Sequence, residues 1–433
     1  MKLRSAIFEL LYRLGSRWRN PHLESSYRFL LETDRWTRER LDAHQLERCR
    51  GFLTFAGRHS AYYRDLFSEI GFEPTALASI EDLRRIPPVD KQVLIRENAR
   101  IRSRHSFPRL HECATSGTSG AVLKFPRDEE WDSAMRAAER RGYAWHGVEP
   151  WERNGYFWGF QIEGWKRVQT RVLDALQNRF RLFSYDEEEI TRFARRLRHA
   201  RYVEGYSSMI YEVARKVNQL GLAGGLELKM VMGTSEKIYE SYQAEVLAAF
   251  GRRIISEYGA AETGLIAFEC PAGSMHIVSE HVVVEVEEDG EILVTNLLSR
   301  SFPVIRYRLG DSVKLAPSDF VCGCGRSHPV ILDVEGRIGK VIRGIEGTYP
   351  SLTLYYVFKN IAHSDHVELS YQAHQREKGK LILLIEQDRP EHASKIDREM
   401  RRYFGSDLVW EIAFGRTFER AGGKLRDFIT TID

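Results

Sequence analysis

The stretch Ala114-Thr-Ser-Gly-Thr-Ser-Gly-Ala-Val-Leu-Lys124 decides how the rest of the chain is interpreted, because it gathers groups that bind anions. Gly117 and Gly120 allow backbone angles that a Cβ would forbid, so this loop can turn N–H groups and hydroxyls inward around a phosphate. Lys124 adds a positive charge at the end of the loop. No Gly-Lys-Ser/Thr follows four residues after a glycine, so the stretch is not a Walker P-loop. From these residues alone, a phosphate loop and a flexible Ser/Thr/Gly linker both remain open.

Four further short motifs follow the loop in order. They are Tyr258-Gly-Ala-Ala-Glu-Thr-Gly264, Tyr307-Arg-Leu-Gly-Asp311, Gly336-Arg337 and Gly422-Gly-Lys424. This ordered set resembles the adenylate-forming superfamily, whose members activate carboxylates with ATP. Two more segments, Pro87-Pro-Val-Asp-Lys91 and Cys322-Gly-Cys-Gly-Arg326, make the chain most similar to the phenylacetate–CoA ligase and CapK-like branch, from about residue 40 to the end.

Length and composition limit the class of protein. A chain of 433 residues is too long for one ordinary core, so two or more domains are expected. The 64 basic and 61 acidic side chains are too balanced for a nucleic-acid binder. No run of about 18 apolar residues is present, so we expect no transmembrane helix. Five cysteines, an odd and small number, favour a reduced cytoplasmic protein, with or without a metal site, over a disulfide framework. The composition leaves open whether the chain forms a homodimer.

The N-terminal segment from Leu3 to Trp18 has apolar residues at helical spacing and several basic residues. It lacks the continuous apolar core and the small-residue cleavage site of a secretory signal. Two interpretations stay open: an amphipathic helix packed on its own domain, or a helix that docks on a membrane surface or a partner.

The order of expected elements predicts an α/β fold. Strands at 202–206, 227–232 and 253–257 alternate with helices, which argues for a parallel sheet, and a helix is expected from Asp128 to His146. Short antiparallel strands are expected from residue 270 to 335, and a small α+β lobe from 341 to 433. We therefore predict a large domain over 1–338 with a β-rich subdomain at about 270–335, a small mobile lobe over 341–433, and a hinge near 339–341.

Two loops beyond strand ends, Gly233–Glu236 and Tyr258–Thr263, are expected to bind ATP, because ligands of parallel sheets sit at the carboxyl ends of strands. Glu262 could hold Mg²⁺, which needs only one or two carboxylates beside phosphate oxygens. Its alternative is a solvated or helix-capping acid. The resemblance implies that Thr263 contacts the α-phosphate and that Asp311 binds the ribose, where a turn residue is the alternative. The complete set implied for ATP or AMP is Thr115, Ser116, Gly117, Thr118, Ser119, Gly120, Lys124, Gly233, Thr234, Ser235, Glu236, Tyr258, Gly259, Asp311 and Arg337.

Two lysines carry the mechanism that the resemblance implies. Lys424 matches a lysine near the C-terminus that reaches the α-phosphate and the carboxylate, where a cation offsets developing charge. Its alternative is a surface residue in a Gly-rich turn. The family commonly has Arg-x-Asp-Asp at the hinge, whereas this chain has Arg337-Ile-Gly-Lys340. Lys340 is expected to serve as the pivot in place of the acids.

A second constellation consists of Cys270, His276, Cys322 and Cys324. Three thiolates and an imidazole suit tetrahedral zinc, and the resemblance implies a structural zinc, although Cys-x-Cys is tighter than the usual spacing. Unliganded thiols are the alternative. Cys113 is expected to be a buried small residue.

The function that the resemblance implies is a two-step ligase. A carboxylate reacts with ATP to give an acyl-adenylate and pyrophosphate, and the acyl group then passes to CoA or to another thiol, amine or hydroxyl. Three alternatives stay open: an adenylyltransferase that keeps AMP on its product, a CapK-like activation of an acid for polysaccharide modification, and a non-catalytic nucleotide-binding scaffold. The aromatic stretch from Asn154 to Trp165 is expected to be a buried strand, a wall of an apolar substrate pocket, or both. The residues proposed for the pocket are Trp158, Phe160 and Tyr206, which core packing would explain equally well.

Overall fold

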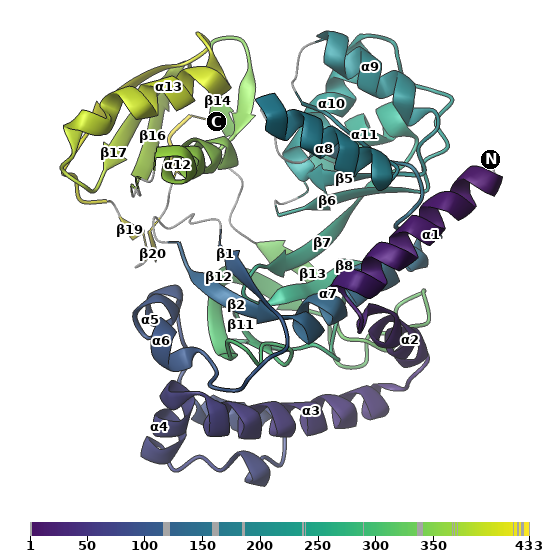
Figure 1. Ribbon diagram of the computed structural model, residues 1–433, viewed down its shortest axis with the longest axis vertical. Coiled ribbons are helices and arrows are strands. Elements are labelled where there is room, and N and C mark those ends of the chain that lie inside the picture. Colours follow the sequence, from purple (N-terminus) through teal and green to yellow (C-terminus); the bar gives the residue numbers. More distant parts are fainter. Residues whose placement is uncertain are drawn as a thin grey trace. The chain divides into compact units, whose positions relative to one another are not determined.

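The chain folds into two compact units (Figure 1). The first contains Met1–Cys113 and Lys124–Arg337, and the second contains Ala114–Leu123 and Ile338–Asp433. The computed structural model describes residues 2–115, 122–157, 164–183, 187–235, 238, 240–288, 290–335, 341–365, 367, 369, 371–418, 420–421, 424–425 and 428–432.

The first unit is built on one eleven-stranded sheet in the order β10-β11-β12-β13-β9-β8-β7-β6-β5-β3-β4. At one end of this order, β4, β3, β5, β6 and β7 pair in parallel. From β7 through β8, β9, β13, β12 and β11 to β10, neighbouring strands pair antiparallel. The prediction of an α/β fold is confirmed. The antiparallel strands that were expected as a β-rich subdomain extend the same sheet. The bounds are β3 (Asn154–Phe157), β4 (Arg179–Arg181), β5 (Tyr202–Tyr206), β6 (Met230–Thr234), β7 (Ile254–Ala260), β8 (Gly264–Glu269), β9 (Met275–Ile277), β10 (Val282–Val286), β11 (Glu291–Asn296), β12 (Val304–Leu315) and β13 (Val330–Glu335).

The parallel half explains where a ligand can bind. All five residues of β5 are buried, the pattern of a strand covered on both faces. The chain runs from β3 outward to β4 and then back to β5, so the strand order reverses next to β3. Such a reversal opens a crevice at the carboxyl ends of the strands. The connecting helices are α8 (Gly164–Leu176), α9 (Glu187–Leu197), α10 (Ser207–Gln219) and α11 (Glu240–Phe250).

Helices of the N-terminal third surround the rest of this unit. The long helix α3 ends where Ser60 leaves helical geometry, and the same side chain accepts a hydrogen bond from the Tyr63 N–H to begin α4. Helix α7 begins at an Asp128 cap and packs against α2 and β8 (Figure 1). The bounds are α1 (Lys2–Arg19), α2 (Leu23–Thr33), α3 (Arg38–His59), α4 (Ala61–Glu69), α5 (Lys91–Arg96), α6 (Asn98–Ile101) and α7 (Glu129–Trp145), with the two-stranded sheet β1 (Leu110–Ala114) and β2 (Lys124–Asp128).

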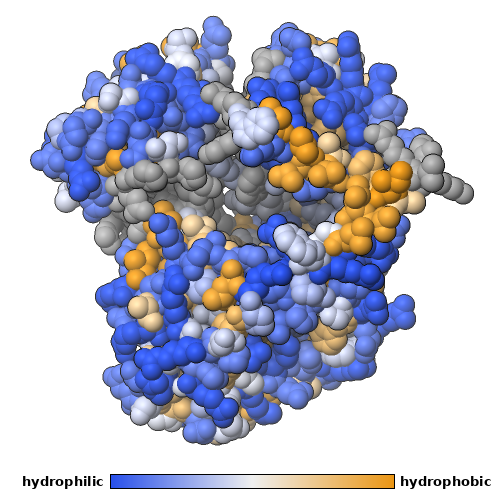
Figure 2. Space-filling view, in the orientation of Figure 1, coloured by the Kyte–Doolittle hydropathy of each residue, from blue (hydrophilic) through white to orange (hydrophobic). Residues whose placement is uncertain are grey.

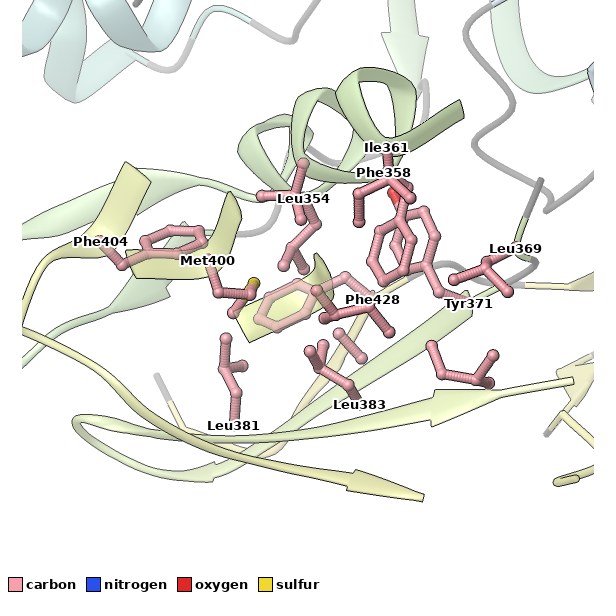
Figure 3. Close-up of a cluster of buried hydrophobic side chains, with 14 of the residues drawn as sticks. Leu354, Phe358, Ile361, Leu369, Tyr371, Leu381, Leu383, Met400, Phe404 and Phe428 are labelled. Atoms are coloured by element: carbon pink, nitrogen blue, oxygen red, sulfur yellow. The ribbon is translucent and has the colours of Figure 1, made fainter. Parts of the chain in front are cut away.

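The second unit has a four-stranded sheet in the order β18-β17-β16-β21 covered by two helices. Its core is aromatic and aliphatic, and the rings of Phe358 and Tyr371 stack with centroids 4.1 Å apart (Figure 3). Leu354, Phe358 and Ile361 are spaced by four and three residues, so α12 turns one stripe toward this core. The bounds are β14 (Val341–Arg343), β15 (Thr348–Pro350), α12 (Leu352–Asp365), β16 (Tyr371–Glu377), β17 (Lys380–Ile385), α13 (Ala393–Phe404), β18 (Val409–Ala413), β19 (Arg420–Ala421), β20 (Lys424–Leu425) and β21 (Phe428–Thr430).

Three expectations and one alternative about local structure were wrong. The segment from Tyr258 to Ala260 lies in β7, and only a tight turn separates it from β8, whereas a loop was expected. The alternative that Asp311 is a turn residue is excluded, because Asp311 lies inside the twelve-residue strand β12. Trp165 belongs to α8 and is exposed, so the aromatic stretch does not continue β3 to that point. Cys113 is half-buried where a buried residue was expected.

Candidate functional site

The hairpin of β7 and β8 presents the best-defined part of the predicted ATP site. A Cβ on Gly259 would lie 2.4 Å from the backbone oxygen of Gly264, so only glycine lets the two strands approach here. The turn that follows buries Glu262 and Thr263, although both side chains are polar. A buried carboxylate at a hairpin turn needs partners, and the structure provides them from another strand.

Two hydrogen bonds connect this hairpin to β12. The Tyr307 hydroxyl donates to Oε1 of Glu262 over 3.1 Å, and the Tyr258 hydroxyl donates to Oδ2 of Asp311 over 2.9 Å. The backbone oxygen of Glu262 also accepts a hydrogen bond from the Asn296 side chain at 3.0 Å. Residues that lie about fifty positions apart in the sequence therefore hold one another in place.

The end of β6 lies beside this hairpin. Thr234 is paired with Glu257, the residue before Tyr258, so both segments reach the same edge of the sheet. A Cβ on Gly233 would lie 2.4 Å from Oγ of Ser207, which shows how closely β6 approaches the start of α10. Ser235 has a φ of 66°, a strained angle for a residue with a side chain and one that often marks a ligand site.

The phosphate loop is only partly within the described residues. The Thr115 N–H donates to the Leu123 carbonyl at 3.0 Å, and the Leu123 N–H donates to Oγ1 of Thr115 at 3.1 Å, so the ends of the loop are closed. Lys124 is exposed at the start of β2, and β20 contains Lys424, whose side chain is not described. The predicted site residues that lie outside the described residues are Ser116, Gly117, Thr118, Ser119, Gly120, Trp158, Phe160, Glu236, Arg337 and Lys340.

A cluster of polar side chains lies around the middle of β5, and no pattern in the sequence indicated it. Glu204 on β5 binds Arg179 at 2.6 Å and accepts a short hydrogen bond from Tyr143. Burial, and then the nearby Glu204, raise the pKa of Glu139 to about 7 despite the opposing effect of an arginine. Burial also raises the pKa of Glu257 well above its ordinary value, with Glu139 and Glu204 adding to the effect. Tyr206, proposed for the substrate pocket, is buried at the end of β5.

The structure brings together the four residues of the predicted metal site. Their ligand atoms all lie within 4.8 Å of one another. The Sγ atoms of Cys270 and Cys322 are 3.7 Å apart, close to the roughly 3.8 Å that two thiolates on a tetrahedral zinc would have. Nε2 of His276 lies 3.1 Å from Sγ of Cys324.

The histidine of this cluster is oriented for a metal. Nδ1 of His276 lies 3.2 Å from the His328 carbonyl, which can only accept, so Nδ1 carries the proton and the Nε2 lone pair points toward the thiols. Burial lowers the pKa of His276 to about 4, which keeps the imidazole neutral. Burial raises the pKa of Cys270 to about 12, so a metal would have to displace its proton.

Several residues that position this chemistry were missed or given no role from the sequence. Tyr307 belongs to one of the motifs, but the motif does not indicate that the hydroxyl of Tyr307 binds Glu262. Nη2 of Arg127 donates to the Ala261 carbonyl at 2.9 Å, directly before Glu262. His328 orients His276 through its backbone, a contact that spacing in the sequence cannot reveal.

The chain is similar over most of its length to phenylacetate-coenzyme A ligases and to the protein CapK. It is 24% identical to the phenylacetate-coenzyme A ligase of Thermus thermophilus, covering 91% of this chain and 97% of the relative. It is 20% identical to the protein CapK of Staphylococcus aureus, covering 90% and 89%. The crystal structure of 2-hydroxyisobutyryl-CoA ligase with 2-HIB-AMP and CoA superposes with a TM-score of 0.62 at 19% identity, covering 92% and 91%.

The chain has the fold of the adenylate-forming ligases. The predicted similarity to the phenylacetate–CoA ligase and CapK-like branch is confirmed, and the class of the curated relatives agrees with the expected class of enzyme. No family model matches the chain. Among the described residues, no helix combines the length and the apolar character that crossing a bilayer requires.

Proposed function

We propose that the protein is an ATP-dependent ligase that converts a carboxylic acid into an acyl-adenylate, releasing pyrophosphate, and then transfers the acyl group to CoA. The observation that carries this proposal is the pair of hydrogen bonds, Tyr258–Asp311 and Tyr307–Glu262, between β7–β8 and β12. These hydrogen bonds hold Asp311, which is suited to a ribose, and Glu262, which is suited to Mg²⁺. Nucleotides bind near strand ends of sheets of this kind.

Each side chain then has a physical role in the first step. Glu262 has one carboxylate oxygen engaged by Tyr307 and fits Mg²⁺ as a single protein ligand beside phosphate oxygens. When bound, Mg²⁺ would neutralise charge on the phosphates. Asp311 accepts hydrogen bonds from the ribose hydroxyls, and Tyr258 flanks the adenine. Thr263 contacts the α-phosphate. Thr115, Ser116, Gly117, Thr118, Ser119, Gly120 and Lys124 bind the β- and γ-phosphates, and Gly233, Thr234, Ser235 and Glu236 line the adenine with Gly259.

The second unit supplies the catalytic cation in this proposal. Lys424 offsets negative charge that develops at the α-phosphorus and the attacking carboxylate. The large domain over 1–338 and the small lobe over 341–433 move about Lys340, and Arg337 approaches the ribose. The lobe presents Lys424 in the first step and withdraws it for transfer.

The acid and the acceptor are defined less sharply. We propose CoA as the acceptor because the phenylacetate-coenzyme A ligase similarity spans nine-tenths of this chain, with an amine or sugar hydroxyl as the alternative suggested by the similarity to CapK. The buried Tyr206 and the aromatic residues Trp158 and Phe160 favour an aryl or apolar acid. A product that retains AMP and a non-catalytic scaffold remain the competing functions.

The decisive experiment measures pyrophosphate release across a panel of carboxylic acids with and without CoA, while acyl-AMP, AMP and ADP are separated. A ligase releases pyrophosphate with the right acid and forms AMP when CoA is added. Persistent AMP on the product would indicate an adenylyltransferase, and no turnover with any acid would favour the scaffold.

Lys424 provides the matched test of two alternating steps. The Lys424→Ala variant should form acyl-AMP about 10²- to 10³-fold more slowly, yet transfer the acyl group from presynthesised acyl-AMP at the normal rate. Lys340→Pro should do the reverse. Lys378→Ala, at an exposed lysine of the same unit, is the control and should change neither step. Equal loss of both steps in Lys424→Ala would contradict the alternation.

We also propose that Cys270, His276, Cys322 and Cys324 hold a structural zinc ion. The donor set, the mutual distances and the orientation of His276 support it. The site sits where β8, β9 and the segment before β13 meet, so a metal would stabilise strands that only short ladders connect.

Metal analysis tests the zinc proposal directly. Protein purified without chelator should contain about one zinc per chain, and the variant Cys322→Ser/Cys324→Ser should lose it and unfold at lower urea concentration. Cys113→Ser changes a thiol outside the cluster and should keep the metal. Metal-free protein of unchanged stability would refute the proposal.

A further inference from the structure

Two helices of the first unit turn apolar side chains toward solvent. In most globular proteins an amphipathic helix buries its apolar stripe. Here α1 and α8 do the opposite, and Figure 2 shows their apolar residues as neighbouring orange areas on one face. The exposed large apolar residues of the two helices are Ile7, Leu10, Leu11, Leu14 and Trp18 on α1, and Trp165, Val168, Val172, Leu173 and Leu176 on α8. We call these ten residues the apolar surface.

Helix α1 is fixed by a different face. The ring of Tyr12 lies 5.4 Å from that of Trp151, and the side chain of Arg109 donates to the carbonyls of Trp18 and Arg19. The apolar residues of α1 recur at intervals of three and four, so they form one stripe that is turned away from Tyr12. Trp18, at the end of the stripe, is 80% exposed.

Helix α8 has an equally clear inversion. Its buried contact is made by Asp174, which binds Arg181 through two hydrogen bonds of 3.0 and 2.9 Å. Trp165, Val172 and Leu176 lie roughly on the opposite side of the helix from Asp174, at 100° per residue. An acidic residue thus faces the protein and the apolar residues face water.

The charge of the two helices is strongly positive, although that of the whole chain is nearly balanced at 64 basic and 61 acidic side chains. The sequences of α1 and α8 contain eight basic residues and two acidic ones. Basic residues beside an apolar stripe with tryptophans at its ends are typical of helices that lie in the interface of an anionic membrane.

A cavity of about 400 Å³ lies between the same elements, since Phe8 of α1 and Arg171 and Ala175 of α8 line it together. Its charged lining consists of six arginines and two acids: Arg153, Arg171, Arg179, Arg181, Arg192 and Arg196, with Asp174 and Glu189. The two acids pair with Arg181 and Arg192. In the part of the chain that the structure describes, Arg171 and Arg196 form no ion pair, and they stack on Phe183 and Phe180. Partial desolvation at the cavity wall and then the neighbouring Arg171 lower the pKa of Arg196, although its side chain stays exposed. A phosphate bound between these two guanidinium groups would relieve their repulsion.

We propose that α1 and α8 form a docking surface for an anionic lipid bilayer. The apolar surface enters the boundary between headgroups and acyl chains, and Arg171 and Arg196 take a lipid phosphate into the cavity. A second copy of this chain fits the surface poorly, because a twofold contact would place two strongly basic helix pairs against each other.

Co-sedimentation of the full chain with vesicles tests this proposal. We expect binding to vesicles of phosphatidylcholine with about one-third phosphatidylglycerol, and little binding to phosphatidylcholine alone. Raising the salt from about 0.1 M to about 1 M shortens the Debye length from about 10 Å to 3 Å and should weaken binding strongly. Leu14→Glu and Val172→Glu should each weaken binding by about tenfold or more. Leu247→Glu, at an exposed leucine on α11 outside the surface, is the matched control and should bind normally.

Substitution of the two arginines tests the phosphate contact independently of the apolar surface. Arg171→Gln/Arg196→Gln should weaken binding to the anionic vesicles by about fivefold per arginine, while the apolar surface is intact. Because these side chains are exposed, circular dichroism and thermal unfolding should match the unchanged protein. Inorganic phosphate at millimolar concentration should compete only weakly with the vesicles.

Three results would overturn the proposal. Equal binding of Leu14→Glu, Val172→Glu and the unchanged protein would exclude the apolar surface. Tight binding of inorganic phosphate that Arg171→Gln/Arg196→Gln abolishes, without any vesicle binding, would make the cavity a site for free phosphate. A dimer in sedimentation velocity that Leu14→Glu dissociates, again without vesicle binding, would make the surface an interface between copies.

Discussion

Replacing Glu280 by glutamine should destabilise the first unit more than any change at its surface. The Glu280 side chain is completely buried, and its Oε1 accepts hydrogen bonds from Arg141 at 2.6 Å, from His328 at 3.0 Å and from Thr33. Arg141 is also buried, and its other carboxylate partner, Asp34, lies 3.7 Å away. Removing the charge of Glu280 therefore leaves a buried guanidinium with one distant carboxylate, Asp34, and the neutral hydroxyl of Thr33.

Breaking a buried ion pair on one side costs about 3–5 kcal/mol. Because Asp34 compensates part of the charge of Arg141, we expect the lower end, about 3 kcal/mol. The double variant Glu280→Leu/Arg141→Met removes both charges and should lose less than the sum of the single changes. The matched surface control is Asp42→Asn, which breaks the exposed pair with Arg38 and should cost less than about 1 kcal/mol.

Urea unfolding followed by tryptophan fluorescence is the appropriate assay, because Trp145 donates to Asp34 at 2.8 Å and stacks against Arg141. A loss below about 1 kcal/mol in Glu280→Gln, with an unchanged m-value, would refute the reasoning, because it would mean that Arg141 finds another partner or water.

The same network predicts how stability depends on pH. Burial alone would raise the pKa of Glu280, but Arg141 and His328 hold this pKa well below its ordinary value. A carboxyl with a depressed folded-state pKa adds stability above its unfolded pKa of about 4.3, and this stability is lost as the pH falls toward the folded value. Between pH 7 and pH 5 the contribution of Glu280 should be constant. Below about pH 4.3 the unchanged protein should lose stability more steeply than Glu280→Gln, as measured by urea midpoints.

Three further changes probe the candidate site. Tyr307→Phe removes the donor to Glu262, so the free energy of unfolding should fall by about 1 kcal/mol and pyrophosphate exchange should slow. Tyr258→Phe leaves Asp311 without that hydroxyl and should raise the KM for ATP while the urea midpoint stays nearly constant. Gly233→Ala places a Cβ where Ser207 already lies and should cost about 1–3 kcal/mol, whereas alanine at a helix glycine with open space around it should be neutral or stabilising.

Elements with a clear period or a clear boundary could be predicted from the sequence. The strand at 202–206 was predicted at its observed bounds, and the helix expected from Asp128 to His146 is α7 (Glu129–Trp145). The first has β-branched and aromatic residues between turn signals, and the second has a capping aspartate. Helix α12 was missed, although Leu354, Phe358 and Ile361 have helical spacing, because its aromatic and β-branched residues also favour strands.

The contacts between distant segments could not be predicted. Glu262 and Asp311 were selected from motifs, but no property of either motif indicates that Tyr307 and Tyr258 bind them. The cluster of Cys270, His276, Cys322 and Cys324 was easier, because residue chemistry alone suggests a shared metal, and strand pairing then brings the four together. Helix α8 itself was not predicted, and even a recognised amphipathic pattern does not say which face is covered.

The hydrogen bonds of the candidate site change how substitutions there should be interpreted. In the proposed site the hydroxyls of Tyr258 and Tyr307 bind Asp311 and Glu262, so a nucleotide would meet acids that are already oriented. Pre-orientation of this kind lowers the cost of ordering side chains on binding. A phenylalanine at either tyrosine therefore acts through the geometry of Asp311 or Glu262, because the charge of the acid is retained. If either phenylalanine variant loses activity while its free energy of unfolding without ligand is unchanged, the hydroxyl acts by positioning the acid and not by stabilising the fold.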